Sequence, residues 1–449
     1  MPSRTDRTVR VAVLADSDTR WKWGVLTARR ISPGSPESSR AGGAENAPAP
    51  TGFVLRGRAT PTTRQLAETA VSDTVPREVT GAEFLREVRV AAERGEGYDV
   101  VVLALVGGTV RAVLQGIADL GLERRPVLVT GYVGVVYEKL ADGLLLRHGA
   151  DVVLANSRHD AERFRAVYEG VGADPGSVVE AALPFLGGAP HKPEPGRDTL
   201  VFAAQPSVPV TKAERAYVLR RLVEHARLHP DREVLLKLRS RPGEHTTHLE
   251  EFPYQKLVRE LPTPPNFRLV YGHMGEVLDR TDLLVTVSST AALEALHRRI
   301  PTAILTDLGV REPLGNHHFI GSGLLTSFDA LDQGAVPEPD ERWLARQGVG
   351  AEGLPGSIPY EQAFDAARER VARLLSGPPL APVAPYYTAE TAGGYLPGIL
   401  ARHRLDRLDL SAPEPRESGV RRIVREAARG AYRHGVQRVA PVIRRLGEL

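Results

Sequence analysis

Short apolar runs recur along the chain and alternate with longer segments in which apolar residues recur at helical spacing. The runs are typical of strands buried on both faces of a parallel sheet, and the segments between them are typical of amphipathic helices. The predicted strands are 9–15, 52–58, 99–106, 126–130, 150–155, 199–204, 233–238, 267–270, 283–287 and 302–305. The clearest predicted helices are 81–94, 109–120, 211–229 and 360–375. This alternation predicts an α/β protein with parallel sheets.

The predicted elements fall into two series, which predicts two domains. A segment rich in Pro and Gly, residues 184–198, separates the series and is the clearest linker. We therefore expect one Rossmann-like domain over 1–183, a second over 199–376 and a C-terminal extension over 377–449. A stretch rich in Pro, Gly, Ser and Ala, residues 32–50, is predicted to be a flexible insertion in the first domain.

Length and composition agree with this organisation and exclude several classes of protein. The 449 residues are too many for one ordinary domain, and an apolar content of 42% is enough for real cores. The absence of Cys excludes disulfides, thiolate catalysis and thiolate metal sites. A net charge of +3 argues against general nucleic-acid binding. No signal peptide and no apolar run of membrane-spanning length is evident, so we expect a soluble, cytoplasmic protein.

The C-terminal segment 418–449 is basic, with eight Arg and two Glu. Its apolar residues can share one helical face: Ile423, Val424, Ala427, Ala428 and Tyr432. Such a helix can lie on an anionic membrane surface, where each basic residue contributes roughly 1 kcal/mol. The alternative is a solvated basic tail, which Gly430, Gly435 and Pro441 favour because they interrupt a helix. Peripheral contact with the inner membrane face is therefore one of two expectations for this tail.

The most informative stretch is 282–305, where an apolar run ends in three hydroxyl side chains. Ser288, Ser289 and Thr290 follow the predicted strand, and a helix-forming segment with Glu294 follows them. The start of a helix offers unpaired N–H groups and the positive end of a dipole, so it favours a phosphate group. A carboxylate about one turn into the helix is placed to accept hydrogen bonds from ribose hydroxyls. The alternative is that the hydroxyls only cap the helix.

This stretch resembles the C-terminal domain of glycosyltransferases with two Rossmann-like domains, the GT-B architecture. Lipid-A-disaccharide synthases, bacterial polysialyltransferases and capsule polymerases carry a similar element. The matching residues are Ser288, Ser289, Thr290, Glu294, Ala295 and Pro301. The resemblance implies that the turn holds the phosphates of a nucleotide-sugar donor and that Glu294 holds the ribose. The chain departs from the pattern in having Arg299-Ile300 where a Gly often precedes the Pro. As a whole it looks closest to an uncharacterised family of actinobacterial glycosyltransferases.

A second group of charged residues follows the predicted strand that begins at residue 233. Lys237, Arg239 and Arg241 lie where its carboxyl end is expected, and ligands of open parallel sheets bind outside such ends. Guanidinium groups bind diphosphate oxygens bidentately, so these residues are candidates for the donor site. Related transferases carry Lys-x-His-Pro at this strand end, whereas this chain has Arg-Pro, so His245 or His248 is the candidate substitute. The alternative is a charged loop.

The loop after the first predicted strand carries the candidate acceptor site. Asp16 and Asp18 are candidate bases, because either carboxylate can deprotonate an acceptor hydroxyl. Trp21 and Trp23 are candidates for stacking on a sugar, with Lys22 between them. The alternative is that the two Asp residues cap the first helix and the two Trp residues pack beneath it.

Two weaker motifs complete the candidate site. A Gly-x-x-Gly sequence after the strand 126–130 lets a ligand approach the backbone at Gly131 and Tyr132, unless it forms an ordinary turn. His273 lies on a loop and is a candidate contact for the donor nucleotide, the alternative being a surface role. No HExxH motif is present, and the Asp-x-Asp triplet follows the first strand. We therefore predict no metal ligands and no cofactor beyond the nucleotide-sugar co-substrate.

Together with this resemblance, the observations predict two Rossmann-like α/β domains facing a cleft, with a basic C-terminal helical tail. The resemblance implies a GT-B-like glycosyltransferase of polysaccharide biosynthesis. The N-terminal domain is expected to hold the acceptor, an unidentified glycan, lipid or small molecule. The C-terminal domain is expected to hold the donor, with fixed dipoles and cations rather than a metal stabilising the leaving nucleotide. Three other functions stay open: a non-hydrolysing nucleotide-sugar 2-epimerase, a glycerophosphate transferase of the teichoic-acid type, and a non-catalytic nucleotide-binding scaffold.

Overall fold

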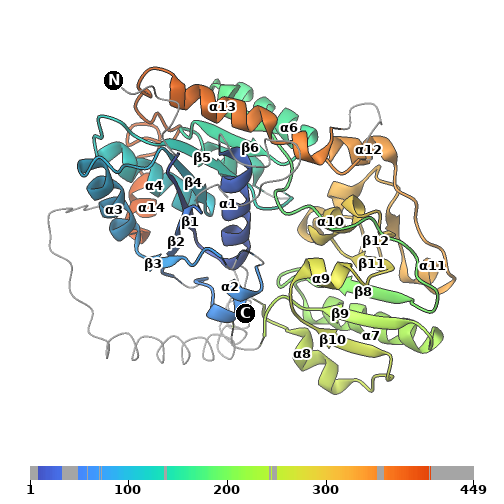
Figure 1. Ribbon diagram of the computed structural model, residues 1–449. Helices are drawn as coiled ribbons and strands as arrows, with labels where there is room; N and C mark the ends of the chain where they lie inside the picture. Colours follow the sequence, from blue (N-terminus) through green and yellow to red (C-terminus); the bar gives the residue numbers. More distant parts are fainter. Residues whose placement is uncertain are drawn as a thin grey trace, which may run out of the picture. The chain divides into compact units, whose positions relative to one another are not determined.

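The protein is described by a computed structural model that covers residues 9–32, 49–57, 59–69, 71, 73–135, 139–241, 244, 250–350, 358–403 and 405. These residues form two compact units (Figure 1). The first unit contains Met1–Leu186 and Glu341–Leu410, and the described part of the second is Gly187–Asp340. The basic tail, and the predicted insertion apart from its ends, lie outside the described residues.

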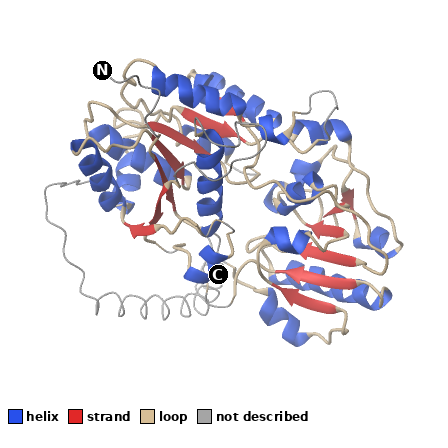
Figure 2. Cartoon of the chain, viewed as in Figure 1, coloured by secondary structure: helices blue, strands red, loops and turns tan. Residues whose placement is uncertain are grey.

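The first unit is built on a seven-stranded sheet with strand order β3-β2-β1-β4-β5-β6-β7. Every strand pair in it is parallel (Figure 2). The strands are β1 Val11–Ala15, β2 Thr51–Leu55, β3 Arg77–Val79, β4 Val100–Ala104, β5 Val127–Gly131, β6 Val152–Ala155 and β7 Val178–Glu180. Near-continuous apolar runs form the central strands because both faces of the sheet are covered.

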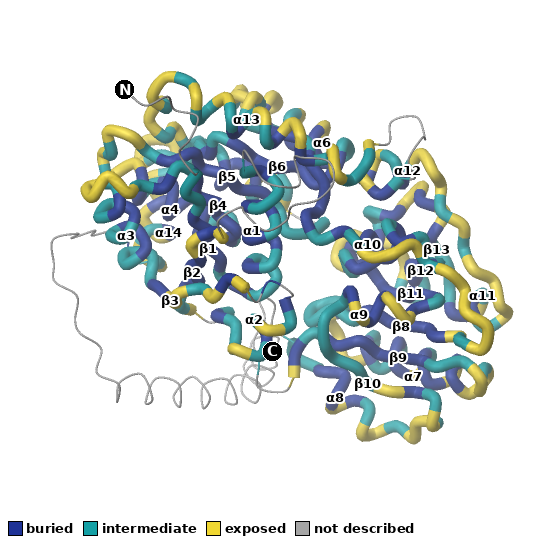
Figure 3. Tube along the Cα trace, in the orientation of Figure 1, coloured by how far each residue is buried: buried dark blue, intermediate teal, exposed yellow. Residues whose placement is uncertain are grey.

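Helices of this unit cover both faces of the sheet and create two cores, and α12 lies outside these cores. They are α1 Asp18–Ile31, α2 Thr63–Ala67, α3 Gly81–Glu93, α4 Gly107–Asp119, α5 Leu140–Leu145, α6 Arg158–Gly170, α12 Glu341–Arg346, α13 Asp365–Ser376 and α14 Leu396–Arg402, with 3₁₀ turns at Pro175–Ser177 and Tyr360–Gln362. Successive residues of β1 point to opposite faces: Leu14 packs in the core beneath α3 and α4, and Val13 packs in the core beneath α1 and α13. The sheet is therefore a buried layer between two helical layers (Figure 3).

The second unit repeats this plan with a six-stranded parallel sheet of order β10-β9-β8-β11-β12-β13. Its strands are β8 Thr199–Ala203, β9 Glu233–Lys237, β10 Phe267–Val270, β11 Leu283–Thr286, β12 Thr302–Leu305 and β13 Leu325–Thr326. Its helices are α7 Lys212–Leu228, α8 Tyr254–Leu257, α9 Met274–Leu278, α10 Ala291–His297 and α11 Phe328–Asp332, with 3₁₀ turns at Val258–Glu260, Glu312–Leu314 and Asn316–Phe319. Both sheets follow the 3-2-1-4-5-6 order of the Rossmann fold, so the predicted pair of Rossmann-like α/β domains is confirmed.

The chain returns to the first unit after Asp340, whereas the sequence predicts that the second domain extends to residue 376. The reason lies in the apolar face of α13 and the turn before it. Phe364, Ala367 and Val371 are fully buried in the core that also contains Trp23 and strand residues of the first sheet. The predicted amphipathic helix therefore forms, but it covers the first sheet.

Truncating Phe364 to Ala is expected to destabilise the first unit by about 3–5 kcal/mol, because a fully buried aromatic side chain leaves a cavity. The measurement is the denaturant midpoint of unfolding, followed by fluorescence of the Trp residues that share this core. The exposed Val310→Ala in the second unit is the control and is expected to change the midpoint little. An unchanged midpoint for Phe364→Ala would show that residues 358–376 do not belong to the first core.

Candidate functional site

Both sheets have a position where ligands of parallel α/β proteins bind. The chain proceeds outward from β1 to β2 and β3, and then places β4 on the other side of β1. The loops after β1 and β4 therefore leave the sheet in opposite directions, and ligands bind outside the carboxyl ends of the strands at such a point. The same reversal lies between β8 and β11 in the second sheet.

In the first unit, Asp16 joins the loops that follow the two central strands. One carboxylate oxygen accepts a hydrogen bond from Arg20 Nη1 at 2.9 Å, and the other accepts from the backbone N–H of Val106 at 3.0 Å. Ser17 caps α1 by accepting from the N–H of Arg20, and Asp18 is the first residue of that helix. Asp16 thus holds the two loops together, a role that the sequence does not predict.

Trp21 and Trp23 lie in the core rather than on a surface open to a sugar. Each is 1% exposed, and both pack in the core beneath α1, as the alternative interpretation predicts. Trp23 also explains a glycine of the Gly-x-x-Gly motif. A Cβ at Gly131 would lie 2.9 Å from Trp23 Cζ2 and 2.9 Å from the carbonyl oxygen of Leu154, so packing within the sheet requires glycine there. Lys22 places its Nζ 4.9 Å from the ring centroid of Phe185.

Tyr132 contacts a buried cation that the sequence analysis missed. The guanidinium carbon of Arg147 lies 4.0 Å from the Tyr132 ring centroid. The Arg147 guanidinium donates to the backbone carbonyls of Leu105, Gly131 and Gly143 at 3.3, 3.1 and 2.7 Å. Burial lowers the pKa of Arg147 and raises the pKa of the Tyr132 phenol. This cation–π pair fixes the loop after β5. The sequence around Arg147 does not indicate that its side chain is buried.

Asp160 is a second titratable residue that the sequence analysis missed in the first unit. It lies in the first turn of α6, where its N–H donates to the capping hydroxyl of Ser157 at 3.0 Å. The residue is only 4% exposed, and its Oδ1 has no hydrogen-bond partner among the described residues. Arg163 Nη1 lies 3.7 Å from that oxygen. Burial outweighs Arg163 and raises the pKa of Asp160 to about 6.

In the second unit, Ser288 joins loops and does not present its hydroxyl to solvent. Its N–H donates to Gln205 Oε1 at 3.2 Å, and its Oγ lies 2.5 Å from the carbonyl oxygen of Leu314. Ser288 is fully buried. Gln205 follows β8 and Ser288 follows β11, so their hydrogen bond spans the point where the strand order reverses.

After Ser288, most of the backbone N–H groups of this motif donate within the protein. The N–H of Ser289 donates to Thr286 Oγ1 at 3.1 Å, and Ser289 Oγ accepts from the N–H of Ala291 at 3.2 Å. The next N–H groups bond in the 3₁₀ manner to the carbonyls of Ser289 and Thr290. Thr290 makes no capping bond through its side chain, and both Ser289 and Thr290 are half-buried. Glu294 is buried in α10, one turn further on.

The charged residues after β9 differ in their exposure. Lys237 is buried, and its Nζ donates to the carbonyl of Leu238 at 2.9 Å. Arg239 is half-buried and Arg241 is exposed, with its guanidinium carbon 5.4 Å from the Tyr271 ring centroid. Both arginines emerge at the same edge of the sheet as Ser289, because all six strands are parallel. His273 is half-buried and precedes α9 at this edge, whereas His245 and His248 lie outside the described residues.

Comparison with known proteins identifies the chain at the level of a family. The family model described as "Putative glycosyltransferase (DUF6716)" matches residues 11–369. The sequence matches no curated protein. No helix in the described part of the chain is long and apolar enough to cross a membrane.

Two solved structures illustrate the similarity in fold. A UDP-GlcNAc 2-epimerase from Neisseria meningitidis bound to UDP-GlcNAc is 9% identical with a TM-score of 0.49, and the match covers 82% of this chain and 100% of that one. The glycosyltransferase SnogD from Streptomyces nogalater is 15% identical with a TM-score of 0.40, and the match covers 88% and 100%. Both TM-scores are below 0.5, so neither likeness bears on what this chain binds.

Replacing Asp160 by Asn is expected to stabilise the chain at neutral pH and not in acid. The pKa of Asp160 is raised in the folded state, so ionisation costs the folded state more than the unfolded one. The cost is absent below the unfolded pKa of 3.8, grows as the pH rises to about 6 and is constant above that. At about 1.4 kcal/mol per pKa unit, it amounts to roughly 3 kcal/mol.

The measurement is the melting temperature of the wild type and of Asp160→Asn between pH 4 and pH 8. Glu169→Gln, an exposed change on the same helix, is the control and is expected to shift the melting temperature little at either end. A stabilisation by Asp160→Asn that is independent of pH would contradict a raised pKa.

Proposed function

We propose, on the premise that the chain belongs to the family described as "Putative glycosyltransferase (DUF6716)", that it transfers a sugar from a nucleotide-activated donor to an acceptor hydroxyl. The second unit holds the donor in this proposal, and the first unit supplies the acceptor site. Membership of the family supports sugar transfer as the activity. The donor assignment has its own support in the loops of the second sheet.

The observation that carries the donor assignment is the grouping of hydroxyls and guanidinium groups at one reversal of strand order. Ser289 and Thr290 follow β11, and Arg239 follows β9, with β8 between the two strands. Neighbouring strands lie about 4.8 Å apart, so β9 and β11 are roughly 10 Å apart at this edge. An arginine side chain and a diphosphate together span that distance. The pair therefore suits a ligand with two phosphates placed over the end of β8.

The geometry also changes which groups are expected to bind the phosphates. Because the N–H groups of Ser288, Ser289 and Ala291 already donate within the protein, the hydroxyls of Ser289 and Thr290 are the better donors. Arg239 and Arg241 supply the positive charge that a leaving nucleotide diphosphate requires, so the proposal needs no metal at this edge. Glu294 stays the candidate for binding the ribose, and His273 stays the candidate contact for the donor nucleotide.

Asp16 and Asp18 stay the candidate bases for the acceptor hydroxyl, and they differ in how far they also hold the structure together. Asp16 holds the loops after β1 and β4 through both of its oxygens. Asp18 lies at the first position of α1, beside the same strand end. Lys22 lies in α1, which follows the loop after β1, and Tyr132 follows β5, the strand next to β4. Trp21, Trp23 and Gly131 are not part of the proposal, because packing accounts for all three.

Combining Arg239→Ala with Ser289→Ala is expected to weaken binding of the cognate nucleotide by about 100-fold or more, since a charge-assisted and a neutral hydrogen bond are both lost. The measurement is calorimetric titration with UDP, GDP, ADP and CMP and with their sugars. Arg220→Ala removes an exposed charge from α7 in the same unit and is expected to leave affinity unchanged.

The same titrations separate the proposed function from its alternatives. Binding without turnover in the presence of candidate acceptors would favour a scaffold, and turnover of the nucleotide-sugar without any acceptor would favour an epimerase. If the double variant loses melting temperature as well as affinity, the two residues are structural.

Asp18→Asn is expected to lower kcat by about 100-fold or more if Asp18 is the base, with the melting temperature nearly unchanged. Asp16→Asn is expected to lower the melting temperature as well as the activity, because an amide cannot accept from both Arg20 and Val106 in the same way. Measuring kcat and melting temperature for both variants distinguishes the two residues. Full activity in Asp18→Asn would leave Asp16 as the candidate.

A further inference from the structure

The segment that follows the family match returns to the first sheet. The match ends at residue 369, and α14 lies beyond it and packs against α4 (Figure 1). Ile399 and Leu405 are buried in the core beneath α3 and α4, one on each side of His403 in the sequence. The N–H of His403 also donates to a carbonyl in the last turn of α14 at 3.1 Å. These contacts fix the backbone from which the His403 side chain extends.

The imidazole of His403 meets the amino end of α4, at the reversal of strand order in the first sheet. Its Nε2 lies 3.3 Å from Thr109 Oγ1, and Thr109 is the buried third residue of α4. The helix begins directly after Val106, whose N–H donates to Asp16. His403 therefore reaches the start of the helix whose preceding loop Asp16 holds. A Cβ at Gly108, the second residue of α4, would meet no atom of the described residues within 4 Å, so space is present there.

The protonation state of His403 is the one that a base requires. Burial lowers the pKa of the imidazole, Arg402 lowers it further, and Asp16 opposes both. The ring is therefore neutral at neutral pH, with one protonated nitrogen and one lone pair. The Thr109 hydroxyl can accept from Nε2–H, which leaves the lone pair on Nδ1. Among the described residues, Nδ1 has no hydrogen-bond partner.

Asp16 is less suited than His403 to take a proton from an acceptor. Both of its carboxylate oxygens already accept hydrogen bonds, one from Arg20 and the other from the N–H of Val106. Its negative charge nevertheless favours the protonated form of His403. An imidazole that accepts a proton beside a carboxylate that stabilises the resulting imidazolium is an effective arrangement for general base catalysis.

We propose that His403 is the base that activates the acceptor hydroxyl, an inference that rests on the proposed sugar transfer and names a further residue for it. Nδ1 takes the hydroxyl proton while the acceptor oxygen forms its bond to the anomeric carbon of the donor sugar. The bond from that carbon to the phosphate oxygen breaks, and the nucleotide leaves with the electron pair. Thr109 holds the ring through Nε2, and the charge of Asp16 stabilises the imidazolium.

The first test needs no substrate and uses the full chain. Diethyl pyrocarbonate modifies accessible neutral imidazoles, and peptide mass spectrometry measures the rate at His403 as a function of pH. The midpoint of this profile is expected below the ordinary histidine value, lower still in Asp16→Asn and higher in Arg402→Gln, because these changes remove opposite charges. The half-buried His159 on α6 is the internal control, and its midpoint is expected to stay the same in both variants. Unchanged midpoints at His403 would overturn the proposal.

The second test measures turnover, as release of the nucleotide from the nucleotide-sugar that the titrations identify, with a panel of sugar and lipid alcohols as acceptors. His403→Gln is expected to lower kcat by about 100-fold or more and to remove the acidic limb of the pH profile of kcat/KM. Nucleotide affinity and melting temperature are expected to stay nearly unchanged, because His403 is half-buried at a helix end. His403→Asn repeats the test with a shorter side chain.

His159→Gln is the matched control for turnover, because it also removes one half-buried histidine from the first unit, and it is expected to keep the wild-type kcat. If both His403 variants keep the wild-type kcat, or if the control loses as much, the inference is wrong while the proposed function stands. If the wild type turns over no nucleotide-sugar at all, the proposed function is wrong and the inference falls with it.

Discussion

In each unit, a side chain in the loop after the first strand accepts a hydrogen bond from a backbone N–H in the loop after the fourth strand. Asp16 accepts from Val106 at 3.0 Å in the first unit, and Gln205 accepts from Ser288 at 3.2 Å in the second. The need arises from topology. Where the strand order reverses, the chains leave in opposite directions and no neighbouring strand offers an acceptor, yet a buried N–H must have one. A side chain supplies it, and the two central loops of each unit are thereby held at a fixed separation.

This constraint decides which groups remain for a ligand in the second unit. Ser288 is committed to Gln205 and Leu314, and the N–H of Ser289 to Thr286, so these two N–H groups are taken up within the protein. The seven residues of α10 also give a weaker dipole than a long helix would. What remains is a pair of hydroxyls on a rigid loop and arginines across β8 from it. Phosphate binding here depends on side chains that the clamped loops position.

The strands were the most predictable part of the chain, because burial on both faces leaves an apolar run that few other structures produce. The predicted strand 99–106 appears as Val100–Ala104. The missed strands are short and at or near sheet edges, such as Arg77–Val79, in which one residue of three is buried. The sequence of a helix does not say whether a given side chain points into a core, and for that reason Trp21 and Trp23 are candidates both for stacking on a sugar and for packing beneath the helix. Likewise, an amphipathic helix does not specify which sheet it covers, so α13 was assigned to the wrong half of the chain on spacing alone.

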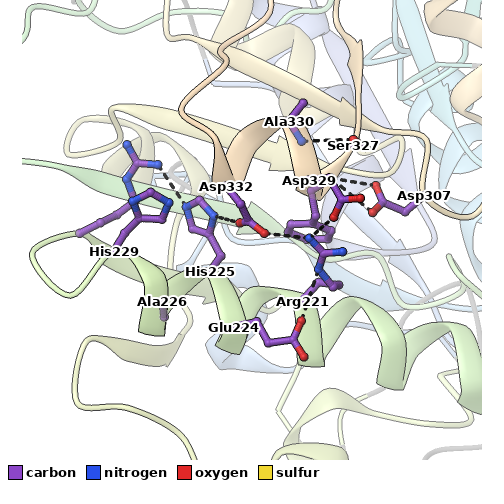
Figure 4. A network of polar contacts seen from close by, with 12 residues as sticks. Arg221, Glu224, His225, Ala226, His229, Asp307, Ser327, Asp329, Ala330 and Asp332 are labelled. Carbon is purple, nitrogen blue, oxygen red and sulfur yellow. Dashed lines mark hydrogen bonds and ion pairs between the residues drawn. The ribbon is translucent and has the colours of Figure 1, made fainter.

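The sequence does not predict the roles of residues whose roles depend on neighbours that are distant in the chain. Neither the residue type nor the spacing of Arg147 distinguishes it in the sequence. Its structural role comes from the three carbonyls and the aromatic ring that surround it. The pair His225 and His229 did carry a signal, an i, i+4 spacing on a predicted helix, but its third partner, Asp332 on α11, lies over a hundred residues away (Figure 4). The other carboxylates around it come from the same two helices and from Asp198 before β8. These residues gather at the amino edge of the sheet, where they fasten α11 to α7 and lie away from the carboxyl edge with its clamped loops.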